Sequence, residues 1–241
     1  MKFGVIVFPG SNCDRDTMYV LENTLQQETH MLWHKNKDLK GFDSGDCIIL
    51  PGGFSYGDYL RSGAIARFSP IMNAVTEFAN AGGYLFGICN GFQILCEAGL
   101  LPGALLLNSS QKFSCKNVFV KPVQFSSPLT RSLGKDDVLK IPIAHAEGRY
   151  FADEATLRSL EQNNQILFKY CDEKGIIDDA ANPNGATLNI AGISNLSKNV
   201  FGMMPHPERA ADEELGNTCG LKILRSIIEY AHSLKAATVA V

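Results

Sequence analysis

Short apolar runs that end abruptly at glycine or proline recur along this chain, and they constrain its fold more than any other feature. The clearest runs are Lys2–Phe8, Cys47–Leu50 and Tyr84–Ile88. Pro9–Gly10 and Pro51–Gly53 end the first two, and stretches with helical spacing lie between the runs. Strands that are buried on both faces and separated by helices are typical of a parallel sheet. We predict an α/β fold with a single doubly wound, mostly parallel sheet and helices on both faces.

The same reasoning places the elements around these strands. Ser11, with Asp14 three residues later, has the form of a capping box and predicts a helix that extends to about Gln27. An apolar stripe at helical spacing near the C-terminus predicts the core face of a final helix. The stripe consists of Leu221, Leu224, Ile228 and Ala231. Further expected strands are His30–Trp33 and Val200–Met204, and further expected helices are Pro70–Asn80 and Asn90–Ala98.

The middle of the chain, between Leu105 and about Tyr170, is predicted to form shorter strands. Examples are Val118–Val123 and Leu139–Ile143. No internal repeat, low-complexity tract or linker rich in proline and serine divides the sequence. We therefore expect residues 1–241 to form a single domain.

Charge and cysteine usage exclude several classes of function. The net charge is -3 and no run of lysine or arginine is present, so nothing predicts binding to nucleic acid or to an anionic membrane. No segment approaches the roughly eighteen continuous apolar residues that a membrane span requires. The 7 cysteines lack CxxC pairs, which argues against both a disulfide framework and a zinc site. We expect a cytoplasmic protein without a bound metal, in which most cysteines are apolar filler.

One cysteine lies in a sequence with chemical meaning. Gly87–Gly91 has the form G-x-C-x-G, with Cys89 at its centre, and it follows a strand and opens a helix. In a nucleophile elbow, such a turn strains the backbone so that the nucleophile projects above the sheet. The N–H groups at the start of the helix would stabilise a thiolate. Cys89 is therefore a candidate nucleophile, and the alternative is a buried cysteine between two turn glycines.

A thiolate requires a proton shuttle, and the chain offers 5 histidines. His206 directly follows a predicted strand, and Glu208 lies two residues away, where its carboxylate can orient the imidazole. His145 lies in a turn-like segment and is a candidate ligand contact. The alternative for His206 is an ordinary surface turn flanked by prolines. We expect structural or solvated roles for the other histidines, which are His30, His34 and His232.

A third segment completes the predicted site. Pro51–Phe54 follows a strand, and its glycines allow backbone N–H groups to approach a ligand. Together with the N–H of Asn90, the N–H of Gly53 would form an oxyanion hole. In open parallel sheets the loops at the carboxyl ends of the strands build the site, so Cys89 and His206 can meet although they lie far apart in the sequence.

These segments, in this order and spacing, resemble the class I, or triad, glutamine amidotransferases, which have flavodoxin-like layering. The resemblance implies that Cys89 attacks the side-chain carboxamide of glutamine, and that His206, aligned by Glu208, protonates the departing ammonia. A γ-glutamyl thioester would remain and be hydrolysed by water. The resemblance also implies substrate contacts, which we assign to Gly52, Phe54, Gln93 and His145. The chain has His145-Ala146-Glu147 where this class is expected to have His-Gly-Glu, and the added methyl group disfavours a left-handed backbone.

Within that class, three segments are similar to the glutaminase subunits of phosphoribosylformylglycinamidine synthase. They are Phe8–Asp14, Pro51–Asp58 and Cys89–Gln93. The similarity implies a large ATP-using synthetase subunit as partner, commonly with a small bridging subunit. The partner would aminate formylglycinamide ribonucleotide in purine biosynthesis. No P-loop is present, so ATP and Mg are expected on the synthetase subunit and no cofactor is expected on this chain.

Two alternatives remain open at this point. The first is another enzyme, either an amidotransferase of a different pathway or a γ-glutamyl hydrolase. The second is a docking subunit without catalytic activity, which the intact Cys89, His206 and Glu208 disfavour.

Overall fold

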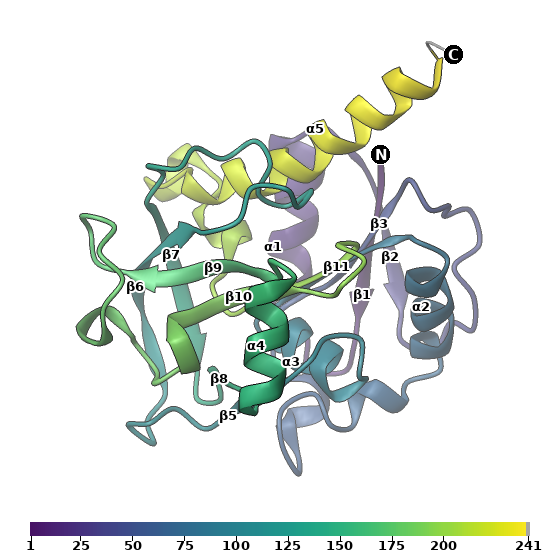
Figure 1. The fold of residues 1–241 in the computed structure, drawn as a ribbon. Coiled ribbons are helices and arrows are strands. Elements are labelled where there is room, and N and C mark those ends of the chain that lie inside the picture. Colours follow the sequence, from purple (N-terminus) through teal and green to yellow (C-terminus); the bar gives the residue numbers. More distant parts are fainter. Residues whose placement is uncertain (240–241) are drawn as a thin grey trace.

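A nine-stranded sheet forms the centre of the computed structural model, which describes residues 1–239 (Figure 1). The strand order is β2-β1-β3-β4-β11-β10-β9-β6-β7. The helices α1 and α5 lie on one side of this sheet, and α2 and α3 lie on the other (Figure 1). The predicted α/β fold is therefore confirmed.

The elements have the following bounds. The strands are β1 (Lys2–Val7), β2 (Glu28–Trp33), β3 (Cys47–Leu50), β4 (Tyr84–Ile88), β5 (Ala104–Leu106), β6 (Ser114–Pro122), β7 (Leu139–His145), β8 (Arg149–Phe151), β9 (Ile166–Cys171), β10 (Ile190–Ser194) and β11 (Val200–Met203). The helices are α1 (Asp14–Tyr19), α2 (Ile71–Asn80), α3 (Asn90–Glu97), α4 (Glu154–Gln162) and α5 (Cys219–Val239). Across residues 1–239, none of the helices combines the length and the apolar character that a membrane crossing needs.

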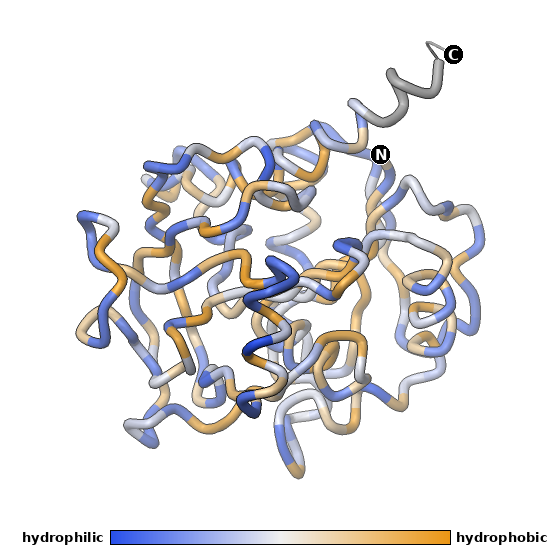
Figure 2. Tube along the Cα trace, viewed as in Figure 1, coloured by the Kyte–Doolittle hydropathy of each residue, from blue (hydrophilic) through white to orange (hydrophobic). Residues whose placement is uncertain are grey.

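The parallel half of the sheet consists of β2, β1, β3, β4 and β11, which all run in the same direction. The strands predicted for these segments are confirmed. Their side chains form the core, and Val5, Ile48 and Leu85 have no exposed surface. Hydrophobic residues concentrate along these central strands, while hydrophilic residues dominate the outer loops (Figure 2). Because the strands are parallel, the loops after β1, β3, β4 and β11 meet at one edge.

The other half of the sheet is antiparallel and contains β10, β9, β6 and β7. The strands expected in this region are present: β6 contains the predicted range from Val118 to Pro122 but ends one residue before Val123, and β7 contains Leu139–Ile143. The helix α4 was missed, because we expected only strands there. Asp153 caps this helix by accepting a hydrogen bond from Thr156 N at 2.7 Å. Leu160 is its only buried residue and Leu157 packs partly buried against the core, so the apolar face of this helix is short.

The predicted capping box at Ser11 is wrong. Ser11 Oγ accepts a hydrogen bond from Phe8 N at 3.1 Å, and Ser11 N donates to Phe8 O at 3.0 Å. The hydroxyl therefore closes the turn after β1 and cannot cap the helix. The helix begins later, at Asp14, and passes into a π-helical turn over Val20–Thr24, so it also ends before Gln27.

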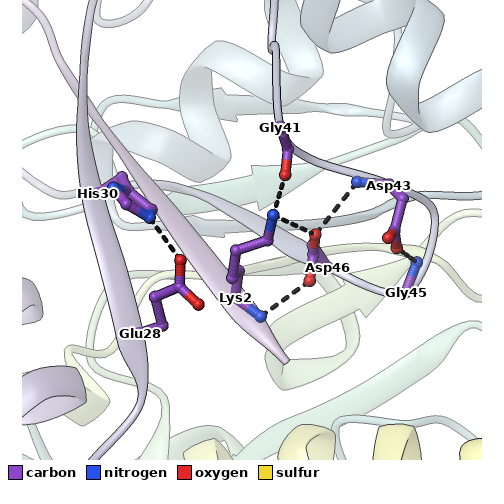
Figure 3. Close-up of polar contacts among 7 residues, drawn as sticks. All are labelled: Lys2, Glu28, His30, Gly41, Asp43, Gly45 and Asp46. Atoms are coloured by element: carbon purple, nitrogen blue, oxygen red, sulfur yellow. Dashed lines mark hydrogen bonds and ion pairs between the residues drawn. The ribbon is translucent and has the colours of Figure 1, made fainter.

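Asp46 lies at the amino ends of the parallel strands, opposite the loops that follow β1, β3, β4 and β11 (Figure 3). This buried carboxylate accepts hydrogen bonds from Lys2 N at 2.8 Å and from Asp43 N at 3.1 Å. It also pairs with Lys2 Nζ at 3.7 Å. Lys2 begins β1, and Asp46 immediately precedes β3, so the interaction holds the starts of two neighbouring parallel strands together.

The final helix, α5, packs its predicted stripe against the rest of the protein. The four stripe residues, Leu221, Leu224, Ile228 and Ala231, are all buried. The prediction of a core-facing helix at this position is confirmed.

The packing of α3 against β3 depends on Gly91. A Cβ atom at this position would lie 1.8 Å from Leu50 O, a distance that no rotamer change can relieve. We expect Gly91→Ala to lower the free energy of unfolding by about 3 kcal/mol, measured by urea denaturation. Gly134→Ala is the matched control, because the nearest atom to its added Cβ lies at 3.6 Å. A Gly91→Ala protein as stable as the control would contradict the packing.

Candidate active site

Cys89 occupies the sharp turn between β4 and α3. Its backbone has φ 50 and ψ -104, a conformation that residues other than glycine rarely adopt. Two hydrogen bonds hold the turn: Cys89 N donates to Met203 O at 2.8 Å, and Gln93 N donates to Cys89 O at 3.1 Å. The predicted strand-to-helix elbow is therefore present, and the thiol stands at the carboxyl edge of the parallel strands.

His206 follows β11 at the same edge of the sheet. Its Nδ1 lies 2.6 Å from Glu208 Oε1, and both side chains are buried. The short contact fixes the ring and leaves Nε2 buried without a hydrogen-bond partner. The structure thus brings Glu208 to His206 as the sequence predicted.

The charges around His206 determine its protonation. Burial alone would lower the pKa of His206, but the negative charges of Glu208 and Cys89 oppose this effect. The thiols of Cys13 and Cys89 also lie close enough to favour the protonated ring, and the net result is a pKa well above the usual value. The arrangement therefore favours an imidazolium beside Cys89, which can pair with a thiolate and then donate a proton.

The glycine pair after β3 forms another wall of the site. A Cβ atom at Gly52 would lie 2.6 Å from His206 Cε1, so the ring packs directly on the peptide backbone. Gly53 has φ 146, and Gly52 O accepts a hydrogen bond from Cys13 N at 3.2 Å. The first N–H groups of a helix have no partner within the helix, so Asn90 N at the start of α3 is free to meet a ligand. An oxyanion hole between Gly53 and Asn90 stays a prediction.

A cavity of about 160 Å³ opens beside Cys89. The predicted residues Gly53, Phe54, Gln93 and His145 are among those that line it. Three further polar side chains that line it were not predicted from the sequence: Asp58, Ser62 and Glu147. Asp58 and Glu147 lie within segments that resemble the amidotransferases, but nothing in the sequence indicates that their side chains share one cavity. A larger cavity of about 630 Å³ lies beyond Glu208, and Cys89 does not line it.

A hydrogen-bond chain connects the elbow to the walls of this cavity. Asn90 Nδ2 donates to Gln93 Oε1 at 2.9 Å, and Gln93 Nε2 donates to Glu147 O at 2.6 Å. Asn90 Oδ1 accepts from Ser55 N at 3.1 Å. The side chain of Gln93 lines the cavity, as predicted, but both ends of its amide are already bonded within the protein.

His145 is a neutral acceptor in this structure. Its Nδ1 lies 3.1 Å from Asn108 Oδ1, an oxygen that also accepts from Gly148 N at 3.0 Å. The shared oxygen places the ring proton on Nδ1 and leaves Nε2 as an acceptor, which is buried without a partner. Burial, followed by the charge of His206, lowers the pKa of His145 to about 4. Ala146 is not among the residues with positive φ, so its methyl group causes no strain.

Cys13 is a second thiol beside the imidazole, although its local sequence indicates only apolar filler. It caps α1, and its Sγ donates to Asn12 Oδ1 at 3.1 Å. Burial raises the pKa of Cys13, so this thiol remains protonated. Cys13, His206 and Glu208 each offer a ligand atom within 4.8 Å of the others, the only such group in the described part of the chain.

The remaining histidines lie outside the cavity. His30 is exposed and lies 2.8 Å from Glu28 (Figure 3), and His232 is exposed on α5. His34 is buried, and its Nδ1 lies 2.8 Å from Tyr56 Oη. These positions agree with the structural and solvated roles expected from the sequence.

A family model and known relatives each match this chain over most of its length. Residues 1–220 match the family described as the CobB/CobQ-like glutamine amidotransferase domain. The subunit PurQ of phosphoribosylformylglycinamidine synthase from Moorella thermoacetica is 56% identical over 230 residues, which is 95% of this chain and 96% of that protein. The PurQ subunit from Koribacter versatilis is 53% identical over 228 residues, which is 95% of this chain and 97% of that protein.

A solved structure has the same fold over nearly the whole chain. It is the structure of PurLQS from Thermotoga maritima, which matches with a TM-score of 0.82 and 42% identity and covers 95% of this chain and 98% of the matched chain.

The charge on Glu208 sets the protonation of His206 in this geometry. In Glu208→Gln burial dominates, so we expect the pKa of His206 to fall below its ordinary value of about 6.5, observed by NMR titration of the ring. A raised folded-state pKa stabilises the wild type below about pH 6.5, and this stabilisation is lost as the pH rises through the folded pKa. The folding stability of Glu208→Gln should therefore lack this pH dependence. Glu213→Gln, on an exposed residue, is the control, and an unchanged titration in Glu208→Gln would contradict the assignment.

Proposed function

The chain belongs to the CobB/CobQ-like glutamine amidotransferase family, and on that premise we propose that it is the glutaminase subunit of a phosphoribosylformylglycinamidine synthase. It hydrolyses glutamine to glutamate and ammonia for the amination of formylglycinamide ribonucleotide. The observation that carries the proposal is the strained Cys89 beside the buried pair of His206 and Glu208, in a chain that is 56% identical to a PurQ subunit over nearly its full length. The site segments all belong to one sheet, which supports a single amidotransferase domain.

The proposed reaction begins with attack of the Cys89 thiolate on the side-chain carboxamide of glutamine. Backbone N–H groups of Gly53 and Asn90 stabilise the oxyanion of the tetrahedral intermediate. His206, held by Glu208, gives its proton to the nitrogen as the C–N bond breaks, so ammonia leaves and a γ-glutamyl thioester remains. The now neutral His206 takes a proton from water, which attacks the thioester and releases glutamate and the thiolate.

The ammonia must be used by another protein. In neutral water ammonia is mostly protonated and no longer nucleophilic, so direct transfer to a bound synthetase preserves its reactivity. The similarity to a chain of the PurLQS structure from Thermotoga maritima supports an assembly with a large synthetase subunit and a small bridging subunit. ATP and Mg would act on the synthetase subunit, and the assembly would work in the cytoplasm.

The competing enzyme functions are less well supported. A γ-glutamyl hydrolase or an amidotransferase of another pathway would not account for identities of 53–56% to PurQ subunits over 95% of the chain. A docking subunit without activity would not need the strained backbone of Cys89.

Removal of the nucleophile tests the proposal directly. In the presence of the synthetase subunit, Cys89→Ala should release ammonia from glutamine more than about a thousandfold more slowly than the wild type, because no thioester can form. Cys115→Ala is the matched control, since this cysteine is exposed and lies on β6. Ammonia release by Cys89→Ala at the wild-type rate would refute the mechanism.

We expect the isolated chain to hydrolyse glutamine slowly and the assembled complex to hydrolyse it at least tenfold faster. Ammonia released by the isolated chain would be lost to water, so we expect docking of the synthetase subunit to activate the site. Steady-state glutamate production, with and without the synthetase subunit, measures the ratio. Equal rates in the two assays would contradict this expectation.

A further inference from the structure

Cys13, His206 and Glu208 form a compact group of side chains that can ligate a metal ion. Each offers one ligand atom, and the three atoms lie within 4.8 Å of one another. No second group of this kind occurs among the side chains that the structure describes. The proposed reaction uses the ring of His206 and one oxygen of Glu208, but it gives no role to Cys13 or to the other oxygen of Glu208.

The three side chains come from two loops at the carboxyl edge of the parallel strands. Cys13 follows β1, while His206 and Glu208 follow β11. A Cβ atom added at Gly52 would lie 2.6 Å from His206 Cε1 and 3.0 Å from Cys13 Sγ, so both side chains pack on the same peptide. Because the ligands lie far apart in the sequence, no CxxC-like spacing announces them.

Glu208 carries a buried ligand atom that the protein does not use. Its side chain has no exposed surface, and Oε1 lies 2.6 Å from His206 Nδ1. The second oxygen, Oε2, is buried without a hydrogen-bond partner. An unpaired acceptor of this kind is costly to bury, and a bound cation removes the cost. The unpaired oxygen therefore indicates a ligand independently of the grouping of the three side chains.

A cavity of about 630 Å³ gives a cation a route to Glu208. Asp16, Asp212 and Glu214 line this cavity together with Glu208. Arg209 is the basic residue among its lining side chains, and its Nε lies 3.1 Å from Asp16 Oδ2. The lining carries more negative than positive charge, which raises the local concentration of cations. A metal ion can thus approach Glu208 without entering the cavity beside the nucleophile.

The donor set identifies the class of metal. A thiolate, an imidazole and a carboxylate are the ligands that Zn²⁺ takes in proteins, whereas Mg²⁺ and Ca²⁺ prefer oxygen ligands throughout. The bond lengths of tetrahedral zinc place its ligand atoms about 3.3–3.6 Å apart. Atoms that already lie within 4.8 Å of one another can reach this spacing through movements of about an ångström. Water would complete the coordination.

We propose that Cys13, His206 and Glu208 bind Zn²⁺ and that the bound ion reversibly inhibits the glutaminase. Thiols and imidazoles ligate a metal without their protons, so Cys13 and His206 release protons to the solvent as the ion binds. His206 then has no proton to give to the leaving nitrogen. The binding of zinc follows from the geometry alone, whereas the inhibition rests on the proposed function.

Cobalt absorption tests the site without any measurement of activity. Co²⁺ substitutes for zinc, and its bond to a thiolate absorbs in the near ultraviolet. The purified Cys89→Ala chain should show this absorption, because Cys13 supplies the thiolate, and added Zn²⁺ should abolish it. Cys13→Ser in the Cys89→Ala background should lose the absorption. Cys115→Ser in the same background is the matched control, since this exposed thiol lies on β6, and it should keep the absorption.

Absorption that survives the loss of Cys13, or that is missing from Cys89→Ala itself, would overturn the inference. Thermal unfolding of each variant shows that it is folded. In the same experiment Zn²⁺ should raise the Tm of Cys89→Ala and should leave the Tm of the variant that also lacks Cys13 nearly unchanged.

Inhibition is measured on the complex with the synthetase subunit, with free Zn²⁺ set by a chelating buffer. Glutamate production by the wild type should fall at least about tenfold at saturating zinc and recover when a zinc-selective chelator is added. Relative to its own zinc-free rate, Cys13→Ser should require at least about tenfold more zinc for half-inhibition, because serine is a poor zinc ligand. Cys115→Ser should respond like the wild type.

Equal half-inhibition of wild type and Cys13→Ser would show that zinc acts elsewhere, and the inference would be wrong. A complex that releases no ammonia from glutamine in the absence of zinc would instead contradict the proposed function. The cobalt measurement would still decide whether the metal site exists.

Discussion

The strained backbone at Cys89 is the constraint on which the rest of the site depends. A residue with φ 50 and ψ -104 persists only if its neighbours hold it, and here β11 binds its N–H while α3 binds its carbonyl oxygen. The helix can start at once because Gly91 lets it contact Leu50 at a distance that no side chain would permit. The thiol therefore has a fixed position before any ligand arrives, which reduces the ordering that catalysis would otherwise require.

The electrostatics of the site divide into two regions. Around Cys89 the buried pair of His206 and Glu208 favours an imidazolium, while His145 stays neutral because of its burial and, secondarily, the charge of His206. At the opposite side of the cavity, Asp58 and Glu147 leave an excess of negative charge. An imidazolium therefore lies beside the nucleophile candidate, and two carboxylates line the same cavity. The two regions are separated by the side chains of Asn90 and Gln93, which bond to each other and to both walls.

Residues whose role follows from local sequence could be predicted, and residues whose role depends on tertiary contacts could not. The strand-to-helix turn at Cys89 and the contact of His206 with Glu208 involve residues that are close together in the sequence. The spacing of these residues was therefore enough to predict both features. Ser11 matched a capping pattern, but the turn after β1 uses its hydroxyl. The helix α4 turns only Leu157 and Leu160 toward the core, a pair too short to distinguish it from the strands around it. Cys13 lies beside His206 only because the loop after β1 crosses Gly52, a contact that no sequence pattern encodes.

The parallel and antiparallel halves of the sheet contribute different residues to the cavity beside Cys89. The antiparallel half is needed to complete this cavity. The parallel half places Cys89 and His206 at the ends of neighbouring strands, β4 and β11, which is sufficient for a nucleophile and its proton donor. Its loop after β3 also contributes Gly53, Phe54, Asp58 and Ser62 to the cavity lining. The antiparallel half supplies the rest of the wall, because β7 pairs with β6 and delivers His145 and Glu147 at its end. The nucleophile and its proton donor therefore belong to the parallel half of the sheet, and both halves are needed to close the cavity.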